Sequence, residues 1–564
     1  MFCRQLFLTS NKRLLSRFAS NLSYVHAASS IPLSTRTIDD HLRKTVEKFP
    51  DRELFVFKQQ QVRKTYEQVM AEAENLAKAL IHLGLERGDR VGIWGPNYYE
   101  WTVTQFAAAA SGLILVNLNP AYEADELKHS LKKVGVKALI SPQAFRYSNY
   151  YDILCSIIPQ MTESKKGIGF VNCPELPELK HVVMFNEDES ALNGVWRFKD
   201  VLNFGGSIEK HSLEERRKRV QFDDPANIEF TSGSTGRSKA VSLSHHNIVN
   251  NANFCGQSLN FNHQTKVCIP NPLFHCFACI VGVIGAVIHG ATCVFPSPSV
   301  SSSATIQALA EERCTALYGT PTIVGCWRSK ALMQRTNMKN FVVGFGCTEL
   351  TTAVTLSRLS ESPLTRMHTV GHLTPHLEMC VMDDSGRIVE RGQAGEVCVR
   401  GYSTMLGYWD DVEQTQKAID SRRWFHTGDV GVVNEDDSLA IVGRIKDMII
   451  RGGENIYPTE IENLILKYPL VKDVHVVGVP DDRLGEEVCA VVQLVDNCSL
   501  DSNELKSFCN SKIAHYKIPR FILFKNRDFL PETSSGKVKK NVLSQKCYAE
   551  LCSGQTEEFL VAKA

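Results

Sequence analysis

Segments with helical spacing of apolar residues alternate along most of the chain with short apolar segments bounded by turn residues. Residues 65–84, TYEQVMAEAENLAKALIHLG, show the helical spacing and end on a glycine, whereas DRVGIWGP at 89–96 contains a short apolar strand. A helix and a strand follow within 101–120, and ALISP (138–142) and HVVMF (181–185) are further strand candidates. This alternation is typical of helices packed on the faces of a parallel sheet, so we expect an α/β fold.

The pattern changes near residue 376, where short strand-like segments joined by tight turns take over. LEMCVMDDSGRIV, GEVCVRG and SLAIVG predict strands between residues 377 and 443. A smaller α/β pattern follows, and we place a domain boundary within residues 442–448. The charged stretch SLEERRKRVQFDDPA, residues 212–226, is predicted to be a surface connection.

The composition is that of an ordinary globular protein. Hydrophobic residues make up 43% and charged residues 22%, and the net charge is +1. A balance so close to neutral favours neither nucleic acid nor an anionic membrane as a partner. The 18 cysteines are spread through apolar segments, which predicts buried, reduced thiols in an intracellular protein and not a disulfide framework.

The N-terminal segment has the composition of a mitochondrial transit peptide. Residues 1–38 contain no Asp or Glu but many serines, and their basic residues are Arg4, Lys12, Arg13, Arg17 and Arg36. We therefore predict a leader over residues 1–30 and a mitochondrial (matrix) location. A disordered basic tail is the alternative. The C-terminal sequence LVAKA does not match a peroxisomal signal.

One apolar segment, residues 276–295, has the length of a membrane span. Gly282, Gly285 and Gly290 interrupt it, so we expect a buried helix that stops near Gly290 and then the strand ATCVF, with a true span as the alternative. The segment opens on CFAC. Its C-x-x-C spacing offers too few ligands for a zinc site, because the sequence contains no second such pair.

Residues 228–239, IEFTSGSTGRSK, start like a strand and continue as a loop of glycines and hydroxyl side chains that ends on Lys239. Glycines let successive backbone N–H groups converge on one anion, hydroxyls add donors, and the lysine adds positive charge. The loop therefore predicts a phosphate-binding site, although it lacks the GxxxxGK[ST] pattern of a Walker A loop. A flexible surface loop with a solvated lysine is the alternative.

This loop resembles the signature [ST]-S-G-[ST]-T-G-x-P-K-G of the adenylate-forming (ANL, acyl-CoA synthetase) superfamily. Other patterns of that superfamily follow in the same order and cover nearly everything after the leader. They are PLFH at 272–275, YGTPT at 318–322, GFGCTE at 344–349, GEVCVRG at 395–401, MLGYW at 405–409, WFHTGDVG at 424–431, GRIKDMIIRGGENIYPTEIE at 443–462, VGVPDDRLGEEV at 477–488 and PETSSGKVKK at 531–540. Two of them, MLGYW and KDMIIRGGENIYPTEIE, are most similar to the mitochondrial medium-chain acyl-CoA synthetases.

The resemblance implies a large adenylation domain, residues 31–443, made of parallel α/β subdomains and a small β-barrel-like part. It implies a small, mobile α+β C-terminal domain over residues 444–564. The implied activity is that of an acid–thiol ligase that uses ATP and Mg²⁺ to form an acyl-adenylate and pyrophosphate, and then transfers the acyl group to coenzyme A (CoA). The expected partners are a fatty acid, ATP and CoA, with no nucleic acid and no transmembrane segment.

The resemblance also implies residues that bind ATP and its metal. The β- and γ-phosphates would be held by the loop residues Thr231, Ser232, Gly233, Ser234, Thr235, Gly236 and Lys239. Thr348 and Glu349 of GFGCTE are expected catalytic residues, and Glu349 would bind Mg²⁺, since a hard cation prefers carboxylate and phosphate oxygens. Phe345 occupies the position of the aromatic residue that stacks on adenine.

Five further residues take roles from the same resemblance. Asp429 would accept both ribose hydroxyls, and Arg444 would contact the ribose–phosphate side. Lys446 matches the hinge about which the smaller domain rotates between the half-reactions. Lys537 would neutralise the transferring phosphate, and His275 would lie beside the reacting carboxylate. Without the resemblance, Asp429 would be an ordinary turn aspartate, Lys537 a solvated lysine and His275 a core histidine.

Three features depart from the family pattern. Ser238 and Ala240 replace a proline and a glycine, so we expect a looser loop and an added Cβ. Between Thr322 and Asn337 only 14 residues remain. At about 1.5 Å per helical residue and about 3.3 Å per strand residue, they cannot form the helices, strand and adenine-contacting loop that the family has there. We expect one adenine wall to be missing or rebuilt.

Three interpretations of this gap stay open: an active ligase with a trimmed adenine wall, an inactive relative that still binds nucleotide or CoA, and a splice form or faulty gene model of an active enzyme. Adenylation followed by transfer to a carrier thiol, or by oxidation, is a competing activity. The patterns do not encode acyl chain length, because a methylene contributes only about 1 kcal/mol of discrimination. They do not encode the oligomeric state either.

Overall fold

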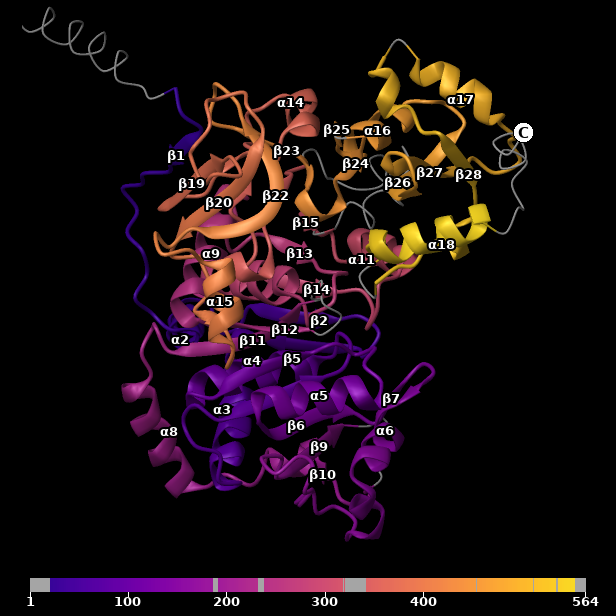
Figure 1. Cartoon of the computed structure of the whole chain (residues 1–564). Helices are drawn as coiled ribbons and strands as arrows, with labels where there is room; N and C mark the ends of the chain where they lie inside the picture. Colours follow the sequence, from indigo (N-terminus) through magenta and orange to yellow (C-terminus); the bar gives the residue numbers. More distant parts are fainter. Residues whose placement is uncertain are drawn as a thin grey trace, which may run out of the picture. The chain divides into compact units, whose positions relative to one another are not determined.

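A computed structural model of the chain, shown in Figure 1, describes residues 21–185, 191–231, 238–317, 319, 341–452, 454–510, 512–533 and 536–552. Its contacts separate two compact units. The larger unit contains His26–Glu378 and Val399–Phe425, and the smaller unit contains the described residues up to Val25, Met379–Cys398 and the described residues from His426 onward.

An eight-stranded sheet forms the frame of the larger unit, with the strand order β10-β9-β6-β4-β5-β11-β12-β21. Neighbours from β10 to β11 are parallel, as the alternating pattern predicts, whereas β12 is antiparallel to both β11 and β21. The strands are β4 (Arg90–Trp94), β5 (Ile114–Leu118), β6 (Val136–Pro142), β9 (His181–Phe185), β10 (Trp196–Arg197), β11 (Pro225–Thr231), β12 (Lys239–Ser244) and β21 (Gly407–Tyr408).

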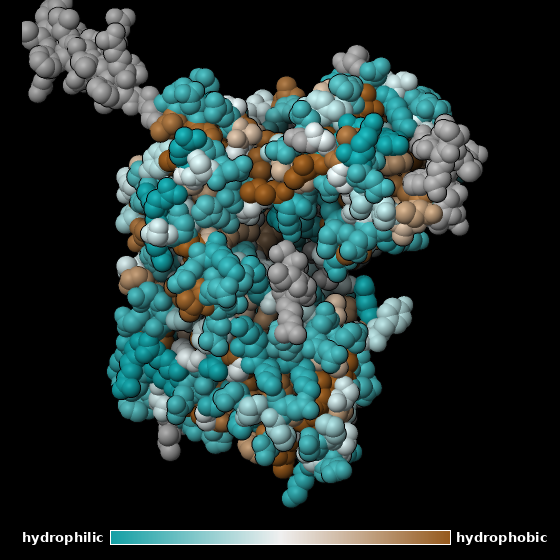
Figure 2. All heavy atoms as spheres, in the orientation of Figure 1, coloured by the Kyte–Doolittle hydropathy of each residue, from teal (hydrophilic) through white to brown (hydrophobic). Residues whose placement is uncertain are grey.

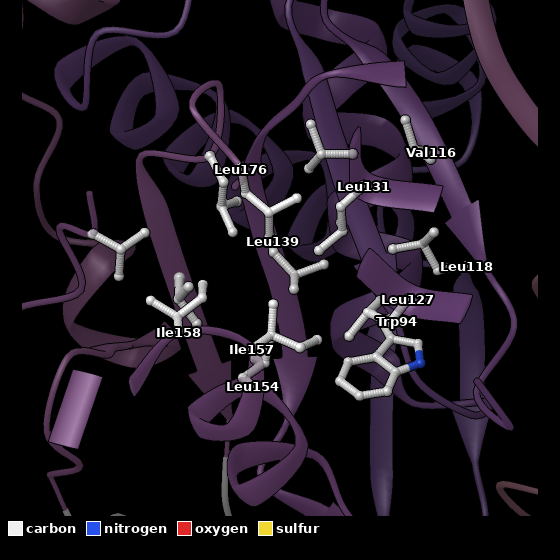
Figure 3. Packing of buried hydrophobic residues seen from close by; sticks show 14 of the residues in the cluster. Trp94, Val116, Leu118, Leu127, Leu131, Leu139, Leu154, Ile157, Ile158 and Leu176 are labelled. Carbon is white, nitrogen blue, oxygen red and sulfur yellow. The ribbon is translucent and has the colours of Figure 1, made fainter. Parts of the chain in front are cut away.

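Two helices beside this sheet lie where the sequence predicts them, in residues 65–84 and at the start of residues 101–120. Thr65 caps the predicted helix, and its side chain accepts a bond from the Gln68 backbone N–H while Gln68 bonds back to the cap. Figure 3 shows the core between the sheet and its helices, where Trp94 lies beside Leu127 and Leu139 lies near Leu131 in one cluster of buried residues. The helices of this region are α2 (Ile38–Lys48), α3 (Tyr66–His82), α4 (Tyr99–Ser111), α5 (Ala124–Val134), α6 (Tyr150–Ile157) and α7 (Phe198–Val201).

A second sheet of the larger unit has the order β15-β13-β14-β2-β3. Residues 276–295, predicted as a buried helix followed by a strand, form a helical segment and then the strand β14. The helical segment is a π-helix, η2 (Phe277–Ile284), then α10 (Gly285–His289), and the chain turns at Gly290, whose φ is +73°. No helix among the described residues is long and apolar enough to cross a membrane. The sheet strands are β2 (Glu53–Phe57), β3 (Val62–Thr65), β13 (Lys266–Cys268), β14 (Thr292–Phe295) and β15 (Ala316–Leu317).

The stretch predicted to be a surface connection, residues 212–226, begins within a helix, α8 (Ser207–Arg219), which the sequence pattern did not indicate. Arg217 explains the difference, because its side chain is only 7% exposed and pairs with three carboxylates. Its guanidinium lies 3.0 Å from Asp39 and 2.8 Å from Glu74 and Glu214. A buried arginine needs such partners, and they fix the helix against α2 and α3.

Shorter elements complete the larger unit. They are the paired strands β7 (Ala144–Phe145) and β8 (Ser148–Asn149), the small sheet β16 (Gly344–Phe345), β17 (Thr355–Leu356) and β18 (His372–Leu373), and the helices α9 (His245–Ser258), α11 (Ser302–Glu311), α14 (Pro363–His368) and α15 (Val412–Ala418).

The smaller unit contains most of a five-stranded sheet, β1-β19-β20-β22-β23, and a second sheet in which β25-β24-β27-β26 are neighbours and β28 pairs with β27. The strands predicted between residues 377 and 443 are confirmed. The division at residues 443 and 444 stays a prediction. The elements are β1 (Tyr24–His26), β19 (Leu377–Met382), β20 (Gly395–Gly401), β22 (Phe425–Val433), β23 (Leu439–Arg444), β24 (Ile449–Arg451), β25 (Glu454–Ile456), β26 (Val471–Asp481), β27 (Gly485–Leu494), β28 (Phe521–Phe524), α16 (Pro458–Ile465), α17 (Ser502–Cys509) and α18 (Lys540–Cys552).

Hydrophilic residues cover much of the surface, as Figure 2 shows for one face. The cysteines that the structure describes are free thiols, and most of them are buried, as their apolar surroundings in the sequence predict.

A buried carboxyl group in β11 gives a pH-dependent prediction. Glu229 is 2% exposed and accepts hydrogen bonds from Asn117 Nδ2 at 3.3 Å and Cys279 Sγ at 3.5 Å. Burial raises the pKa of Glu229 to about 7, although these bonds oppose the rise. The folded state therefore binds a proton that the unfolded state releases, and stability falls as pH rises from about 4.5 to about 7.

We expect Glu229→Gln to raise the melting temperature by several degrees above pH 7 and to have little effect near pH 4.5, because glutamine stays neutral. Thermal unfolding of both proteins across this pH range measures the difference. Glu67→Gln, at an exposed position of α3, is the control and should show no pH-dependent difference. A Glu229→Gln effect of equal size at all pH values would contradict the assignment.

Candidate active site

The ends of the glycine-hydroxyl loop are held by β11 and β12. Thr231 is the register partner of Lys239, so the two ends of the loop lie opposite each other on antiparallel strands. Ser232, Gly233, Ser234, Thr235 and Gly236 lie outside the described residues. The middle of β11 is buried and parallel to the fully buried β5, whereas its last residues before the loop, Phe230 and Thr231, are half-buried. A loop closed in this way can direct its backbone N–H groups to one point.

The structure accommodates both substitutions at the end of the loop. Ala240 is 1% exposed and its Cβ belongs to the core cluster around Trp94, so the added methyl group fills apolar space. Ser238 Oγ accepts a long hydrogen bond, 3.5 Å, from the hydroxyl of Tyr122. Its side chain therefore contacts Tyr122, which belongs to the same core cluster.

Lys239 and Glu349 flank one aromatic ring. Lys239 Nζ lies 4.6 Å from the ring centroid of Tyr408, and the Tyr408 hydroxyl donates to Glu349 Oε1 at 3.0 Å. Among the described residues, Glu349 Oε2 has no hydrogen-bond or ion-pair partner. One carboxylate oxygen is therefore fixed and the other is available, which fits a residue that shares a hard cation with phosphate oxygens.

The backbone around Glu349 is fixed as well. Glu349 lies in the short 3₁₀ turn η3 (Thr348–Leu350), and its carbonyl accepts from the Met405 N–H at 2.8 Å. Thr348 Oγ1 contacts Cys276 Sγ at 3.7 Å. Gly346, just before this turn, must be glycine, because a Cβ there would lie 1.8 Å from the Thr352 carbonyl oxygen.

His275 precedes η2 and is neutral. Burial lowers its pKa to about 4, and its Nε2 is buried with no hydrogen-bond partner among the described residues. Its ring packs beside that of Phe274, with ring centroids 4.2 Å apart. A neutral imidazole with an unused nitrogen can bind a polar ligand atom. Phe345 lies half-buried in β16, and the described contacts do not join it to Lys239 or Glu349.

The smaller unit contains the other group of expected site residues. Asp429 on β22 is the register partner of Arg444 on β23, and Arg444 Nε lies 2.8 Å from Asp429 Oδ1. The Asp429 side chain is 7% exposed, and burial raises its pKa, although the charges of Arg444 and Lys537 oppose the rise. Thr427 holds the strand start, since its Oγ1 accepts from the Asp429 N–H at 3.0 Å and donates to the Val397 carbonyl at 2.7 Å.

Lys537 belongs to the same electrostatic group. Its side chain reaches solvent, yet the protein atoms around its amine, and then the charge of Arg444, lower its pKa, while Asp429 raises it. The loop that carries it is tied by Thr533, whose Oγ1 accepts from the Lys537 N–H at 3.0 Å. Lys446 is exposed in the short turn η4 (Ile445–Asp447) and its charge also lowers the pKa of Lys537.

The structure adds residues that the sequence prediction did not select. Tyr408 is the first, although its motif MLGYW was recognised. Glu396 and His426 are the second and third. Glu396 Oε2 lies 2.7 Å from His426 Nδ1, and Glu396 Oε1 accepts from the Gly428 N–H at 3.0 Å, so the pair fixes the turn that leads to Asp429. The motifs GEVCVRG and WFHTGD that carry this pair were visible in the sequence, but no spacing rule indicates that they meet.

The shortened stretch between Thr322 and Asn337 lies outside the described residues. The prediction that an adenine wall is missing or rebuilt there is therefore not tested by the geometry.

The sequence matches two family profiles. The AMP-binding enzyme profile matches residues 42–334 and 324–409, and the AMP-binding enzyme C-terminal domain profile matches residues 460–537. The two matched segments of the first profile overlap over residues 324–334.

Curated relatives cover nearly the whole chain. It is 40% identical over 560 residues to a protein of Danio rerio named medium-chain acyl-CoA ligase ACSF2, mitochondrial, and the match covers 94% of this chain and 91% of the relative. The Homo sapiens protein of the same name is 38% identical, with coverage of 95% and 91%. A Bacillus subtilis protein named putative acyl-CoA synthetase YngI is 37% identical, with coverage of 90% and 97%.

Solved structures share the fold. The anthranilate CoA ligase AuaEII in complex with anthranoyl-AMP superposes with a TM-score of 0.79 at 22% identity and covers 93% of this chain and 99% of its own. A Mycobacterium tuberculosis fatty acyl CoA synthetase superposes with a TM-score of 0.67 at 26% identity, with coverage of 91% and 98%.

The Glu396–His426 pair leads to a second pH-dependent prediction. Hydrogen bonds to Cys398 and Glu396 raise the pKa of His426 to about 10. A histidine whose folded pKa exceeds its unfolded value of about 6.5 contributes its full stability below pH 6.5 and loses it as pH rises to 10. We expect His426→Gln to lower the melting temperature most at pH 6 and progressively less toward pH 10.

Thermal unfolding at several pH values measures this trend, with His211→Gln, at an exposed position of α8, as the control. A deficit that stays constant from pH 6 to pH 10 would show that the loss comes from packing and not from the charge of His426.

Proposed function

Because this chain belongs to the AMP-binding enzyme family, the adenylate-forming superfamily that its motifs resemble, we propose that it is an ATP-dependent ligase that joins a medium-chain fatty acid to CoA. Two of the relatives are named as medium-chain acyl-CoA ligases, which supports the substrate class. The observation that carries the proposal is the arrangement of Asp429, Arg444 and Lys537, because it combines a diol acceptor with cations for a nucleotide phosphate.

In the first half-reaction, a carboxylate oxygen of the acid attacks the α-phosphorus of ATP, and pyrophosphate leaves. Negative charge develops on the phosphate oxygens, so placed cations lower the barrier. We assign Lys537 to the α-phosphate, because the charges of Arg444 and Asp429, both expected to bind the nucleotide, act on its amine. Asp429 would accept the ribose hydroxyls, and Arg444 would contact the ribose–phosphate side.

The loop from Thr231 to Lys239 would bind the β- and γ-phosphates through its N–H groups, its hydroxyls and the lysine. Glu349 fits Mg²⁺, because Oε2 is available while Oε1 is fixed by Tyr408. A Mg²⁺ ion held by Glu349 would neutralise part of the negative charge of the phosphates. Phe345 remains our candidate for stacking on adenine, and Thr348 for support of the catalytic turn.

In the second half-reaction, the CoA thiol attacks the acyl carbon, the bond from that carbon to the AMP oxygen breaks, and the thiol proton goes to solvent. His275 is proposed to contact the reacting acyl group through Nε2, because this buried nitrogen has no hydrogen-bond partner among the described residues. Lys446 is proposed as the hinge of a rotation between the two half-reactions.

We propose a mitochondrial location, with residues 1–30 as the leader. The acid-free, arginine-containing composition of residues 1–38 supports it, as do the mitochondrial relatives. The Bacillus subtilis relative of similar identity shows that a homologue of this kind also exists outside mitochondria.

Pyrophosphate release tests the proposal. Protein without the leader is incubated with ATP, Mg²⁺ and single acids from acetate to palmitate. We expect acid-dependent release with a maximum at medium chain length, and we expect Lys537→Ala to lower it by at least about 100-fold, because the lost cation faces the charge that develops in the transition state. Lys539→Ala removes an exposed lysine of the same segment and should retain activity.

A second candidate rests on the shortened stretch between Thr322 and Asn337. A protein that has lost an adenine wall could bind ATP or CoA without turnover. Folded wild-type protein that binds ATP but releases no pyrophosphate with any acid would favour this candidate and contradict the ligase.

A further inference from the structure

We propose that Tyr408 is a positioning residue that keeps the phosphate-loop lysine, Lys239, apart from the metal-binding carboxylate, Glu349, so that each stays available to MgATP. The inference rests on the proposed function, because it takes Lys239 and Glu349 as ligands of the nucleotide and its metal. It assigns a role to Tyr408, whose motif was recognised without one.

The backbone holds Tyr408 against the strand that begins at Lys239. Tyr408 is the register partner of Val241, and the flanking N–H groups of Leu406 and Trp409 donate to Ser242 and Ala240 at 2.9 and 2.7 Å. These bonds lie on either side of the tyrosine, so the ring cannot move along β12 without breaking the pairing.

The same segment is tied to the turn that carries Glu349. The Met405 N–H donates to the Glu349 carbonyl at 2.8 Å, three residues before Tyr408. The Tyr408 N–H donates to Thr415 Oγ1 at 2.9 Å, at the helix α15. Residues 405–409 therefore join the end of the phosphate loop to the metal turn through the main chain, before any side chain is considered.

The side chain of Tyr408 then separates two opposite charges. Its ring presents a face to Lys239 Nζ, 4.6 Å from the centroid, and its hydroxyl donates to Glu349 Oε1 at 3.0 Å. Lys239 and Glu349 form no ion pair with each other in the described part of the chain. A cation over an aromatic face is held weakly and keeps its N–H groups for a phosphate.

The chemistry of the ring explains why a tyrosine suits this position. Tyr408 is only 7% exposed, so an ammonium and a carboxylate brought together here would attract each other strongly. A direct Lys239–Glu349 pair would neutralise both groups and compete with MgATP.

Two variants separate the two contacts. Tyr408→Phe keeps the ring and removes the hydroxyl, so Glu349 loses the bond that orients it. We expect the Mg²⁺ concentration for half-maximal activity to rise about five- to tenfold, with the KM for ATP at saturating Mg²⁺ changed less than twofold. Tyr408→Leu removes the ring too, lets Lys239 pair with Glu349, and should raise the KM for ATP about tenfold even at saturating Mg²⁺.

A binding measurement without turnover gives an independent readout. Titration calorimetry with ATP in EDTA and with ATP in excess Mg²⁺ should show that Tyr408→Phe weakens only the Mg²⁺-dependent gain in affinity, whereas Tyr408→Leu weakens both. Combining Tyr408→Phe with Glu349→Gln should produce no further loss of that gain, because the hydroxyl acts through Glu349. Tyr150→Phe, which removes another buried hydroxyl bonded to the Pro120 carbonyl at 3.1 Å, is the control and should match wild type.

The outcomes distinguish this inference from the proposed function. Absence of acid-dependent turnover in wild type would contradict the proposed function itself. Active wild type with a Tyr408→Phe variant unchanged in both Mg²⁺ dependence and MgATP binding would overturn the role of Tyr408. A lower kcat with neither affinity altered would also overturn it, because that is the result of a purely structural residue. If Tyr408→Leu does not fold, Tyr408→Phe and the combined variant still decide the question.

Discussion

The pairing of β12 with β11 on one side and β21 on the other is the interaction on which the candidate phosphate site depends. It brings Thr231 opposite Lys239 and so closes the loop, and it brings Tyr408 to the strand that starts at Lys239. Both neighbours are antiparallel in a sheet that is otherwise parallel. The parallel core supplies a buried, rigid frame, while the antiparallel end supplies the short return that a phosphate-binding hairpin needs.

Charge is handled differently in the two groups of candidate residues. In the larger unit, the neutral ring of Tyr408 contacts both Lys239 and Glu349, and these two residues form no ion pair with each other in the described part of the chain. In the smaller unit, Asp429 and Arg444 are paired directly at 2.8 Å. A paired carboxylate is suited to accept hydrogen bonds from neutral hydroxyls, such as a ribose diol, whereas an unpaired lysine is suited to a phosphate.

Much of the fold and of the site follows from the sequence, because local patterns carry it. The helix that ends before Gly84, the strand from Arg90 and the turn at Gly290 are local, and the structure has them where the patterns predict. The order of the motifs identifies the family, and the family pattern indicates the candidate residues. The role of each residue stays a prediction until it is tested by substitution.

The features that the sequence did not indicate depend on contacts between distant segments. Arg217 turns a charged stretch into a packed helix only because Asp39 and Glu74 come to it. The sequence predicts only that Glu229 lies in a strand. The fold buries its carboxyl group and gives it a hydrogen bond from Asn117. Tyr408 contacts Glu349 across 59 positions of the chain. No local pattern encodes such meetings, since each requires the completed sheets.

Oxygen transfer tests the central claim, adenylation of a carboxylate, most directly. Octanoate labelled with ¹⁸O in its carboxyl group is incubated with the protein, ATP, Mg²⁺ and CoA, and the nucleotide products are analysed by mass spectrometry. If a carboxylate oxygen attacks the α-phosphorus and the thiol then breaks the acyl–oxygen bond, AMP gains one ¹⁸O atom for each acyl-CoA formed. Unlabelled AMP, or ADP with the label in inorganic phosphate, would contradict the account.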